Sequence, residues 1–309
     1  MTQKIATREA YGKSLARLGL ENKNIVVLDA DLSKSTKTAD FKKVCPERFI
    51  NVGIAEQNLA GISAGLATTG KIPFMSTFAM FAAGRAFEII RNAVCYPKLN
   101  VKVCATHAGL TVGADGASHQ AIEDLALMRS IPNMVVLNPA DAVSTDKILE
   151  AIVAYDGPVY VRLGRAAVPV VYNESSKIEI GKANMIQDGS DATIIATGIM
   201  LAEAMTAAET LKEEGISVRI LDMHTIKPLD NEAVIKAARE TKGIVTAEEH
   251  TIFGGLGSAV AEVLVENHPA PMRRIGVKDT FGESGNPGEL MVKYHLTADD
   301  IVKAVKELV

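Results

Sequence analysis

The sequence predicts an α/β protein of two domains, each a mostly parallel sheet with helices on both faces. Its 309 residues are 48% hydrophobic, which is enough apolar material for two ordinary cores. Short apolar runs typical of buried strands alternate with amphipathic segments of helical period, and this alternation stops once and then resumes. We therefore expect a first domain over residues 1–170, a linker over 171–189 and a second domain over 190–309.

The first domain should begin with an amphipathic helix over 7–19 and a buried strand that starts at Ile25 and runs into a polar loop ending at Ser35. Later elements of this domain are expected as extended segments 49–52 and 71–77, helices from 53 and over 80–94, strand 101–106, a Gly-rich loop to 119, helix 120–130, strand 134–137, helix 142–154 and strand 158–163. In the second domain, strands 192–198, 217–221, 243–247 and 274–277 should alternate with helices 200–214, 230–240 and 256–266, before final helices that reach 309.

Composition limits the possible classes of protein. A net charge of −4 without a long charge run offers no basic surface for nucleic acid. Cys45, Cys95 and Cys104 lack CxxC spacing, which favours a reducing compartment and disfavours a zinc site. The N-terminus lacks the apolar core of a signal peptide, and no run of about twenty apolar residues occurs. We therefore expect a soluble, cytoplasmic protein.

The helix expected within residues 53–70 contains small and apolar residues, and Glu56 is its only ionisable side chain. Because it has no polar stripe beyond its first turn, we expect it to be buried nearly all round, with Gly61 and Gly65 where another backbone packs close. Two interpretations of Glu56 stay open. Its carboxylate either caps or stabilises the helix N-terminus, or is held away from water and exchanges a proton or a hydrogen bond with a ligand.

Polar and aromatic side chains gather where the first domain's strands end, and parallel sheets bind ligands at that edge. The loop over 106–119 gives the most specific functional signal among these segments. It carries two imidazoles and a carboxylate, and its glycines allow the backbone to approach a ligand closely. The candidates are Asp29, Asp31, Ser33, Ser35, Glu56, Phe78, Phe81, His107, Asp115, His119, Arg162 and Arg165.

Several of these residues have an alternative interpretation without a functional role. Phe78 and Phe81 are either core residues or loop aromatics that stack on a flat heterocycle. Arg8, Arg162 and Arg165 are either solvated surface charges or a clamp for an anion such as a phosphate ester.

Other sites are disfavoured. No Ser-His-Asp order, nucleophile elbow or HExxH motif occurs, which argues against covalent side-chain catalysis and a protein-only metal site. The segment 253–259, Phe-Gly-Gly-Leu-Gly-Ser-Ala, is an incomplete dinucleotide fingerprint, which we interpret as close helix packing.

Four motifs, taken together, resemble the pyrimidine-binding domain of transketolase in order and spacing. They are Val-Gly-Ile-Ala-Glu-Gln-Asn at 52–58, Ser-Thr-Phe-Ala-Met-Phe at 76–81, Ala-Thr-His-Ala-Gly at 105–109 and Val-Gly-Ala-Asp-Gly-Ala-Ser-His at 112–119. Residues from 190 onward are similar to the transketolase C-terminal domain. The family's magnesium–diphosphate motif, Gly-Asp-Gly followed downstream by Asn, is missing. The chain therefore resembles the C-terminal subunit of a split transketolase.

The resemblance implies roles for the cofactor residues. Glu56 matches the glutamate that hydrogen-bonds the aminopyrimidine ring of thiamine diphosphate and promotes the imino tautomer that deprotonates thiazolium C2. Phe78 and Phe81 match aromatics that pack on the pyrimidine. Asp31 and Leu32 match a pair near the cofactor.

The resemblance also implies a substrate site. Asp115 matches the aspartate that reads a substrate hydroxyl, and His119 the histidine near the ketose carbonyl end. Arg162 is a weaker choice for the phosphate than Arg165, which aligns by its place in Leu-Gly-Arg. Gly84 stands where the family often has a tyrosine, and Ala114 where it often has an acidic residue. The residues implied to hold the sugar phosphate are Arg8, Ser35, His107 and Arg165.

The implied activity is that of a transferase of the pentose phosphate pathway, which moves a two-carbon ketol unit from a ketose phosphate to an aldose phosphate. Thiamine diphosphate and Mg²⁺ are its implied cofactors, with the Mg²⁺ ligands on an N-terminal partner subunit. The implied assembly is an α2β2 heterotetramer in which this chain also self-associates through both domains.

The alternatives within the same cofactor class are deoxyxylulose-phosphate synthase and the β chain of 2-oxo-acid dehydrogenases. The former shares Gly-Ile-Ala-Glu-Gln but usually lacks counterparts of His107 and Phe81. A non-enzymatic assembly subunit is disfavoured because the polar candidate residues at the strand ends are all present. A dinucleotide oxidoreductase is supported only by the weak glycine motif at 253–259.

Overall fold

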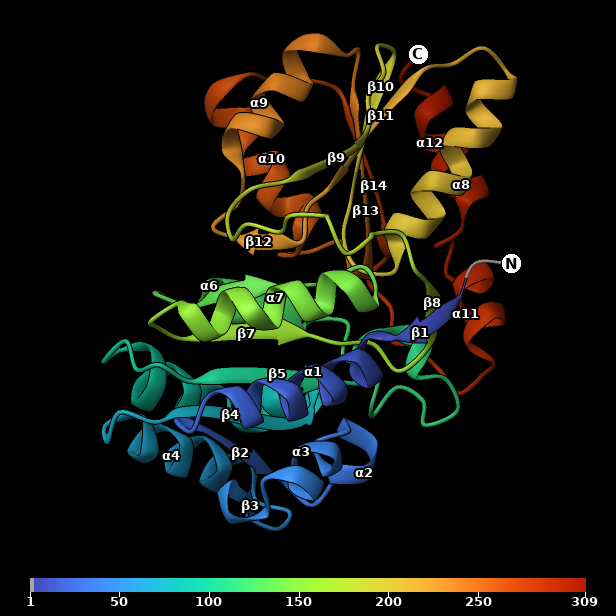
Figure 1. Ribbon diagram of the computed structural model, residues 1–309. Coiled ribbons are helices and arrows are strands. Elements are labelled where there is room, and N and C mark those ends of the chain that lie inside the picture. Colours follow the sequence, from blue (N-terminus) through green and yellow to red (C-terminus); the bar gives the residue numbers. More distant parts are fainter. Residues whose placement is uncertain (1–2) are drawn as a thin grey trace.

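Two mostly parallel sheets organise the structure, a computed structural model that describes residues 3–309 (Figure 1). We call residues 3–170 the N-terminal half and residues 181–309 the C-terminal half, which lies uppermost in Figure 1. Strands alternate with helices in both halves, as the apolar periodicity predicts. The predicted α/β class is therefore confirmed, whereas the predicted domain limits stay a prediction. No helix in residues 3–309 combines the length and apolar character needed to cross a membrane.

The first sheet has seven strands in the order β12-β6-β7-β5-β4-β2-β3. Neighbouring strands are parallel except β12 and β6, so the carboxyl ends of six strands open on one edge. The strands are β2 (Ile25–Asp29), β3 (Phe49–Asn51), β4 (Ile72–Phe78), β5 (Lys102–Thr106), β6 (Val135–Leu137), β7 (Val159–Arg162) and β12 (Thr225–Lys227).

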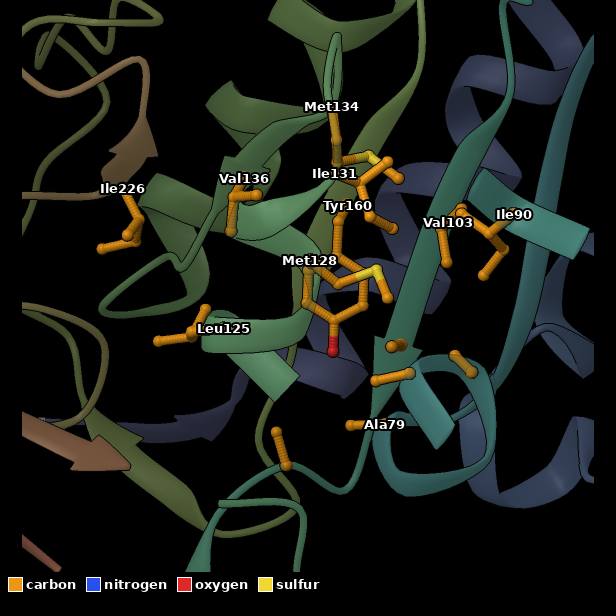
Figure 2. Close-up of a cluster of buried hydrophobic side chains, with 14 of the residues drawn as sticks. Ala79, Ile90, Val103, Leu125, Met128, Ile131, Met134, Val136, Tyr160 and Ile226 are labelled. Atoms are coloured by element: carbon orange, nitrogen blue, oxygen red, sulfur yellow. The ribbon is translucent and has the colours of Figure 1, made fainter. Parts of the chain in front are cut away.

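Helices cover both faces of this sheet because successive strand residues point to opposite sides. On one face, Val27 packs with side chains of α1 (Thr7–Glu21), α3 (Ala39–Val44) and α7 (Ala142–Ala154). On the other, Leu28 packs with α4 (Glu56–Ala67) and α6 (Asp124–Ser130). Figure 2 shows part of this second cluster, in which Met128 of α6 lies beside Tyr160 of β7.

Two local predictions for the N-terminal half need correction. The segment 80–94 is helical, but its turns widen into π-helix over Phe81–Arg85 and Ile90–Cys95, on either side of α5 (Phe87–Ile89). Wide turns of this kind often occur at functional sites. The polar loop after β2 contains a short helix, α2 (Ser33–Thr36).

The second sheet has the order β14-β13-β10-β11-β9, with only β9 antiparallel to its neighbour. In Figure 1, α9 and α10 lie on its left and α8 and α12 on its right. Short α11 (Pro287–Lys293) precedes α12. The other elements are β9 (Asn184–Gln187), β10 (Ala192–Ala196), α8 (Met200–Glu213), β11 (Val218–Asp222), α9 (Asn231–Glu240), β13 (Ile244–Thr251), α10 (Leu256–Asn267), β14 (Met272–Val277) and α12 (Ala298–Lys306).

The two halves are joined by more than a linker. Strand β12 belongs to the C-terminal half but pairs antiparallel with β6 of the first sheet. The segment predicted as linker contains β9, which pairs with β11 of the second sheet. A small antiparallel pair, β1 (Lys4–Ala6) with β8 (Ala167–Pro169), ties the two ends of the N-terminal half together. The halves therefore share hydrogen-bonded strands.

Helix α4 differs from its prediction. Its side chains at Glu56, Leu59 and Ala60 are buried, but Gln57 and Asn58 are exposed in this chain. A Cβ added at Gly61 or Gly65 would meet no atom within 4 Å. The expectation of burial all round is therefore wrong for the single chain, because one face of the helix has no neighbour from this chain.

Candidate functional site

The four residues predicted to hold a phosphate come from four segments and meet at the carboxyl edge of the first sheet. Arg8 lies in the first turn of α1, Ser35 in α2, His107 directly after β5 and Arg165 after β7. Arg8 Nη1 donates to the Ser35 carbonyl at 2.9 Å and lies 3.3 Å from His107 Nε2. Arg165 Nη1 donates to the carbonyl of Val112. We call Arg8, Ser35, His107 and Arg165 the cationic cluster.

The cationic cluster is crowded with positive charge. Burial, followed by the charges of Arg8 and Arg165, lowers the pKa of His107 to about 3, so its imidazole is neutral at ordinary pH. Burial and the nearby Arg165 charge also lower the pKa of Arg8. Within residues 3–309 neither Arg8 nor Arg165 forms a salt bridge, since Glu9 beside Arg8 pairs with Lys37, and Arg8 Nε is buried without a hydrogen-bond partner. Such a cluster is electrostatically suited to an anion.

An aromatic wall stands beside the cationic cluster. The ring of Phe78 stacks on His107 at 3.9 Å between centroids, and Phe81 lies 5.8 Å from Phe78. His119 meets both phenyl rings edge-on, at 6.2 and 5.4 Å. His107 adopts a φ of +58°, which is uncommon for a residue other than glycine. This backbone conformation accompanies the placement of its ring against Phe78.

The structure does not bring every predicted residue into contact with this group. Asp115 is exposed on the loop between Val112 and His119, with no hydrogen bond among the residues described. Asp31 is exposed, and its carboxylate accepts from Asn51 Nδ2 at 2.9 Å. Leu32 is half-buried, and its N–H donates to the buried carboxylate of Asp29 at 2.6 Å. Asp31 and Leu32 follow β2 and Asp115 lies in the loop after β5, so all three belong to the same edge of the sheet.

Glu56 starts α4 and is 5% exposed. Its partner is Arg85, whose Nη1 donates to Glu56 Oε1 at 3.0 Å and whose guanidinium lies 4.2 Å from the centroid of Phe81. A planar N–H donor of this chain thus stacks on Phe81 and bonds the glutamate. An aminopyrimidine has the same two properties, a flat face and N–H donors. The residues present therefore fit that group, provided that Arg85, whose side chain is 54% exposed, moves aside.

Arg162 has a structural place. It is 4% exposed, and its Nε donates to Asp124 at 2.9 Å while Tyr160 donates to the same carboxylate at 2.7 Å. Its Nη2 donates to the carbonyls of Ala121 and Glu249. Arg162 thus faces the contact between the two halves, and Arg165 is the arginine of the cationic cluster. This agrees with the sequence-based preference for Arg165.

Sequence reasoning missed Glu249, near the end of β13. Its side chain is 2% exposed, and Oε1 accepts from the N–H of Thr111 at 2.6 Å. Burial raises the pKa of Glu249 to about 7. The available signal was the pair of carboxylates at 248 and 249 after an apolar strand, because charges in such a position need a partner.

The glycine-rich start of α10 is filled by its own chain. Glu248 accepts from the N–H groups of Leu256 and Gly257 at 2.7 and 2.8 Å. A Cβ at Gly255 would lie 2.1 Å from the Glu248 carboxylate. The carboxylate takes the place in which a dinucleotide would bind its phosphate. The interpretation as close packing is confirmed. No group of three or more His, Cys, Asp or Glu side chains in residues 3–309 is arranged to hold a metal ion.

Comparison with known proteins gives two family matches in tandem. Residues 3–170 match the transketolase pyrimidine-binding domain, and residues 181–301 match the transketolase C-terminal domain. A protein of Methanocaldococcus jannaschii, whose name describes a transketolase C-terminal section, is 54% identical over 97% of this chain and 95% of its own length. The transketolase of Rattus norvegicus is 42% identical over 99% of this chain but only 49% of its own length.

One solved structure is similar along its whole length. It is titled as a split gene transketolase, an inactive beta4 tetramer, and is 60% identical to this chain. The match has a TM-score of 0.93 and covers 98% of both chains.

Proposed function

The chain belongs to the transketolase family, and from that premise we propose that it is the C-terminal subunit of a split transketolase. It transfers a two-carbon ketol unit from a ketose phosphate to an aldose phosphate, together with an N-terminal partner subunit. The rat transketolase supports this division, because this chain corresponds to about half of its length. The M. jannaschii relative has a similar extent to this chain.

The observation that carries the proposal is the cationic cluster. Arg8, Ser35, His107 and Arg165 converge from four segments, and within the part of the chain that the structure describes no carboxylate forms a salt bridge with either arginine, although the charge of Glu9 acts on Arg8. A phosphate ester would supply the negative charge and accept from both guanidinium groups. Because His107 is neutral, its ring can both pack on Phe78 and accept from Arg8. The cluster thus selects phosphorylated sugars over free ones.

The aromatic wall and Glu56 form the proposed pyrimidine end of the site. Phe81 offers a half-buried ring face for a flat heterocycle, Phe78 supports it from between Phe81 and His107, and Glu56 offers a nearly dry carboxylate. When bound there, thiamine diphosphate supplies a nucleophilic carbon that cleaves the bond next to a ketose carbonyl. Glu56 would hold a proton between its Oε1 and a ring nitrogen of the pyrimidine.

The rest of the loop faces the substrate in this proposal. His119, at the edge of both phenyl rings, would donate to or accept from oxygen atoms near the ketose carbonyl. Asp115 would accept from a substrate hydroxyl, and Asp31 with Leu32 would flank the cofactor. We place the Mg²⁺ ligands on the partner subunit, in an α2β2 heterotetramer in which this chain also self-associates, and the reaction in the pentose phosphate pathway.

The test is reconstitution. The chain, expressed alone and together with its N-terminal partner, is assayed for ketol transfer with thiamine diphosphate and Mg²⁺. We expect transfer only from the complex, because the chain lacks the family's diphosphate motif. Full ketol transfer by the purified single chain would contradict the split assembly. If the complex transfers no ketol unit between pentose or hexose phosphates, the proposed activity is wrong.

A further inference from the structure

The loop that carries Asp115 and His119 is shaped by turns at both of its ends. We call residues 109–119 the substrate loop. Gly109 and Gly113 both have a φ of +82°, and Leu110–Val112 form one turn of 3₁₀ helix between them. The carbonyl of Val112 accepts from Arg165. The position of this turn therefore affects one arginine of the cationic cluster as well as the loop.

The first end of the substrate loop rests on a carboxylate of the C-terminal half. Glu249 accepts from the N–H of Thr111 at 2.6 Å. A Cβ at Gly109 would lie 2.2 Å from the carboxyl carbon of Glu249, so only glycine lets the loop pass this close. The contact joins residues 138 positions apart in the chain. Glu249 thus defines where the turn sits.

Glu249 is itself held in place. Arg162 donates to its backbone carbonyl at 2.9 Å and to the carboxylate of Asp124. Arg162 thus pairs with one buried carboxylate, Asp124, and fixes the backbone of Glu249, while its charge also acts on the Glu249 carboxylate. A glutamine could accept from Thr111 equally well in shape. Burial raises the pKa of Glu249 to about 7, so part of the molecules hold it ionised at neutral pH, and that form accepts a stronger, charge-assisted bond from the loop amide than a glutamine would.

The other end of the substrate loop also rests on the C-terminal half. Gln120 Nε2 donates to the carbonyl of Glu283 at 2.9 Å and to that of Leu110 at 3.1 Å. A Cβ at Gly116 would lie 2.6 Å from Ser284 Oγ. Residues 282–285 therefore lie directly against the loop. Both ends of the substrate loop depend on contacts with the C-terminal half.

We propose that Glu249 is a positioning residue, which holds the substrate loop and, through Val112, Arg165 in the arrangement that binds the sugar phosphate. This inference rests on the proposed function for its substrate. The C-terminal half thus contributes to substrate binding through the loop it supports, without contacting the substrate.

The experiment compares Glu249→Ala, Glu249→Gln and a matched control, Asp222→Asn. Asp222 is a carboxylate of the same half with no exposed surface, and it accepts from Tyr172 at 2.6 Å but makes no hydrogen bond to the substrate loop. Amide hydrogen exchange of each chain, in complex with its partner, reports on residues 109–119. The KM of the complex for a phosphorylated aldose is measured in parallel.

We expect Glu249→Ala to speed exchange in the substrate loop by about tenfold or more and leave exchange in α7 unchanged, because only the loop loses its anchor. The KM should rise about tenfold with a smaller change in kcat, since binding geometry is lost before chemistry. Glu249→Gln should lie between Glu249→Ala and wild type, with loop exchange faster than in wild type and a KM about two- to fivefold higher, because its neutral amide oxygen still accepts the hydrogen bond but more weakly. Asp222→Asn should change neither.

Unchanged loop exchange in both Glu249 variants would overturn the proposal, as would equal effects from Asp222→Asn. If Glu249→Ala does not fold, Glu249→Gln decides alone. In that case a KM of the Glu249→Gln complex about two- to fivefold above wild type, together with faster loop exchange, supports the proposal. Wild-type KM and wild-type loop exchange in Glu249→Gln overturn it. Loop exchange needs no transketolase activity, so a failure of the proposed function, seen as absent ketol transfer, is distinguishable from a failure of this inference.

Discussion

The two ends of the proposed site are built differently. At the phosphate end, His107 is 3% exposed and the substrate loop behind it rests on Glu249, so the cationic cluster is supported from both halves of the chain. At the pyrimidine end, the half-exposed Arg85 is the one side-chain partner of Glu56 among residues 3–309. Ile54, two residues before it, is 78% exposed.

This difference indicates which end the chain completes by itself. The phosphate end has its buried scaffold in place, whereas the pyrimidine end borders a face of α4, formed by Gln57, Asn58, Gly61 and Gly65, that no part of residues 3–309 covers. The exposed face fits a site that closes only when another surface is added. Three predictions test the contrast, from the largest expected effect to the smallest.

Substituting Glu56, the carboxylate at the pyrimidine end, should have the largest effect on activity. Glu56→Gln keeps the shape but cannot hold the proton, so hydrogen–deuterium exchange at thiazolium C2 in the reconstituted complex should slow by about a hundredfold or more. The thermal melt should hardly change, because a helix-terminus charge contributes only about 0.3–1 kcal/mol. A wild-type exchange rate in Glu56→Gln would refute the proton-holding role.

Substituting an arginine at the phosphate end should have a smaller and more selective effect. Arg165→Leu or Arg8→Leu should raise the KM for sugar phosphates about ten- to a hundredfold, because a charged hydrogen bond contributes about 1.5–3 kcal/mol. Non-phosphorylated acceptors should be hardly affected. The folded-state pKa of His107 is about 3, below its usual value, so this ring takes up a proton only in strong acid. The arginine effect should therefore be the same at pH 7 and pH 8.

The control for this prediction is Arg17→Leu. Arg17 lies on the same helix as Arg8 but pairs with Asp146 and Glu150, away from the cluster. Its KM should equal that of wild type. An equal loss on phosphorylated and free acceptors in the Arg165 variant would mean that this arginine supports the fold or an interface.

The smallest effect should come from the open helix face. Gly61→Ala should stabilise the single chain by about 0.5–1 kcal/mol, because alanine favours a helix and nothing lies within 4 Å of the added methyl. Gly109→Ala should destabilise it, because the added Cβ meets the Glu249 carboxyl group and φ is +82°. Thermal melts of the two variants measure both. A lower melting temperature for Gly61→Ala would show that this face is covered in solution.

Local patterns allowed most elements to be predicted. Helix α7 runs over 142–154 as expected, because Asp141 and Ser144 form a capping box and apolar residues recur at helical spacing. The π-helical turns near Phe81 were not predicted, since the same residues are compatible with an ordinary helix and packing selects the wider turns. Burial of α4 was overestimated for a related reason. An apolar pattern shows that a face needs a partner but not which chain supplies it.

For the site, strand-end positions and motifs predicted residues that the structure brings together at the carboxyl edge of the first sheet, while their roles in binding stay a prediction. They could not predict that Arg85 pairs with Glu56, because that contact depends on the direction of a wide helical turn.

The sequence by itself determined the α/β class, the motif order and the residues at the carboxyl ends of the strands, because all three follow from local periodicity and spacing. Only the tertiary structure decided that Arg162 pairs with Asp124, and that Glu249 supports a loop 138 positions away. These outcomes depend on how the two halves pack. Buried charges must find their partners across that contact, and sequence spacing contains no information on such distant pairs.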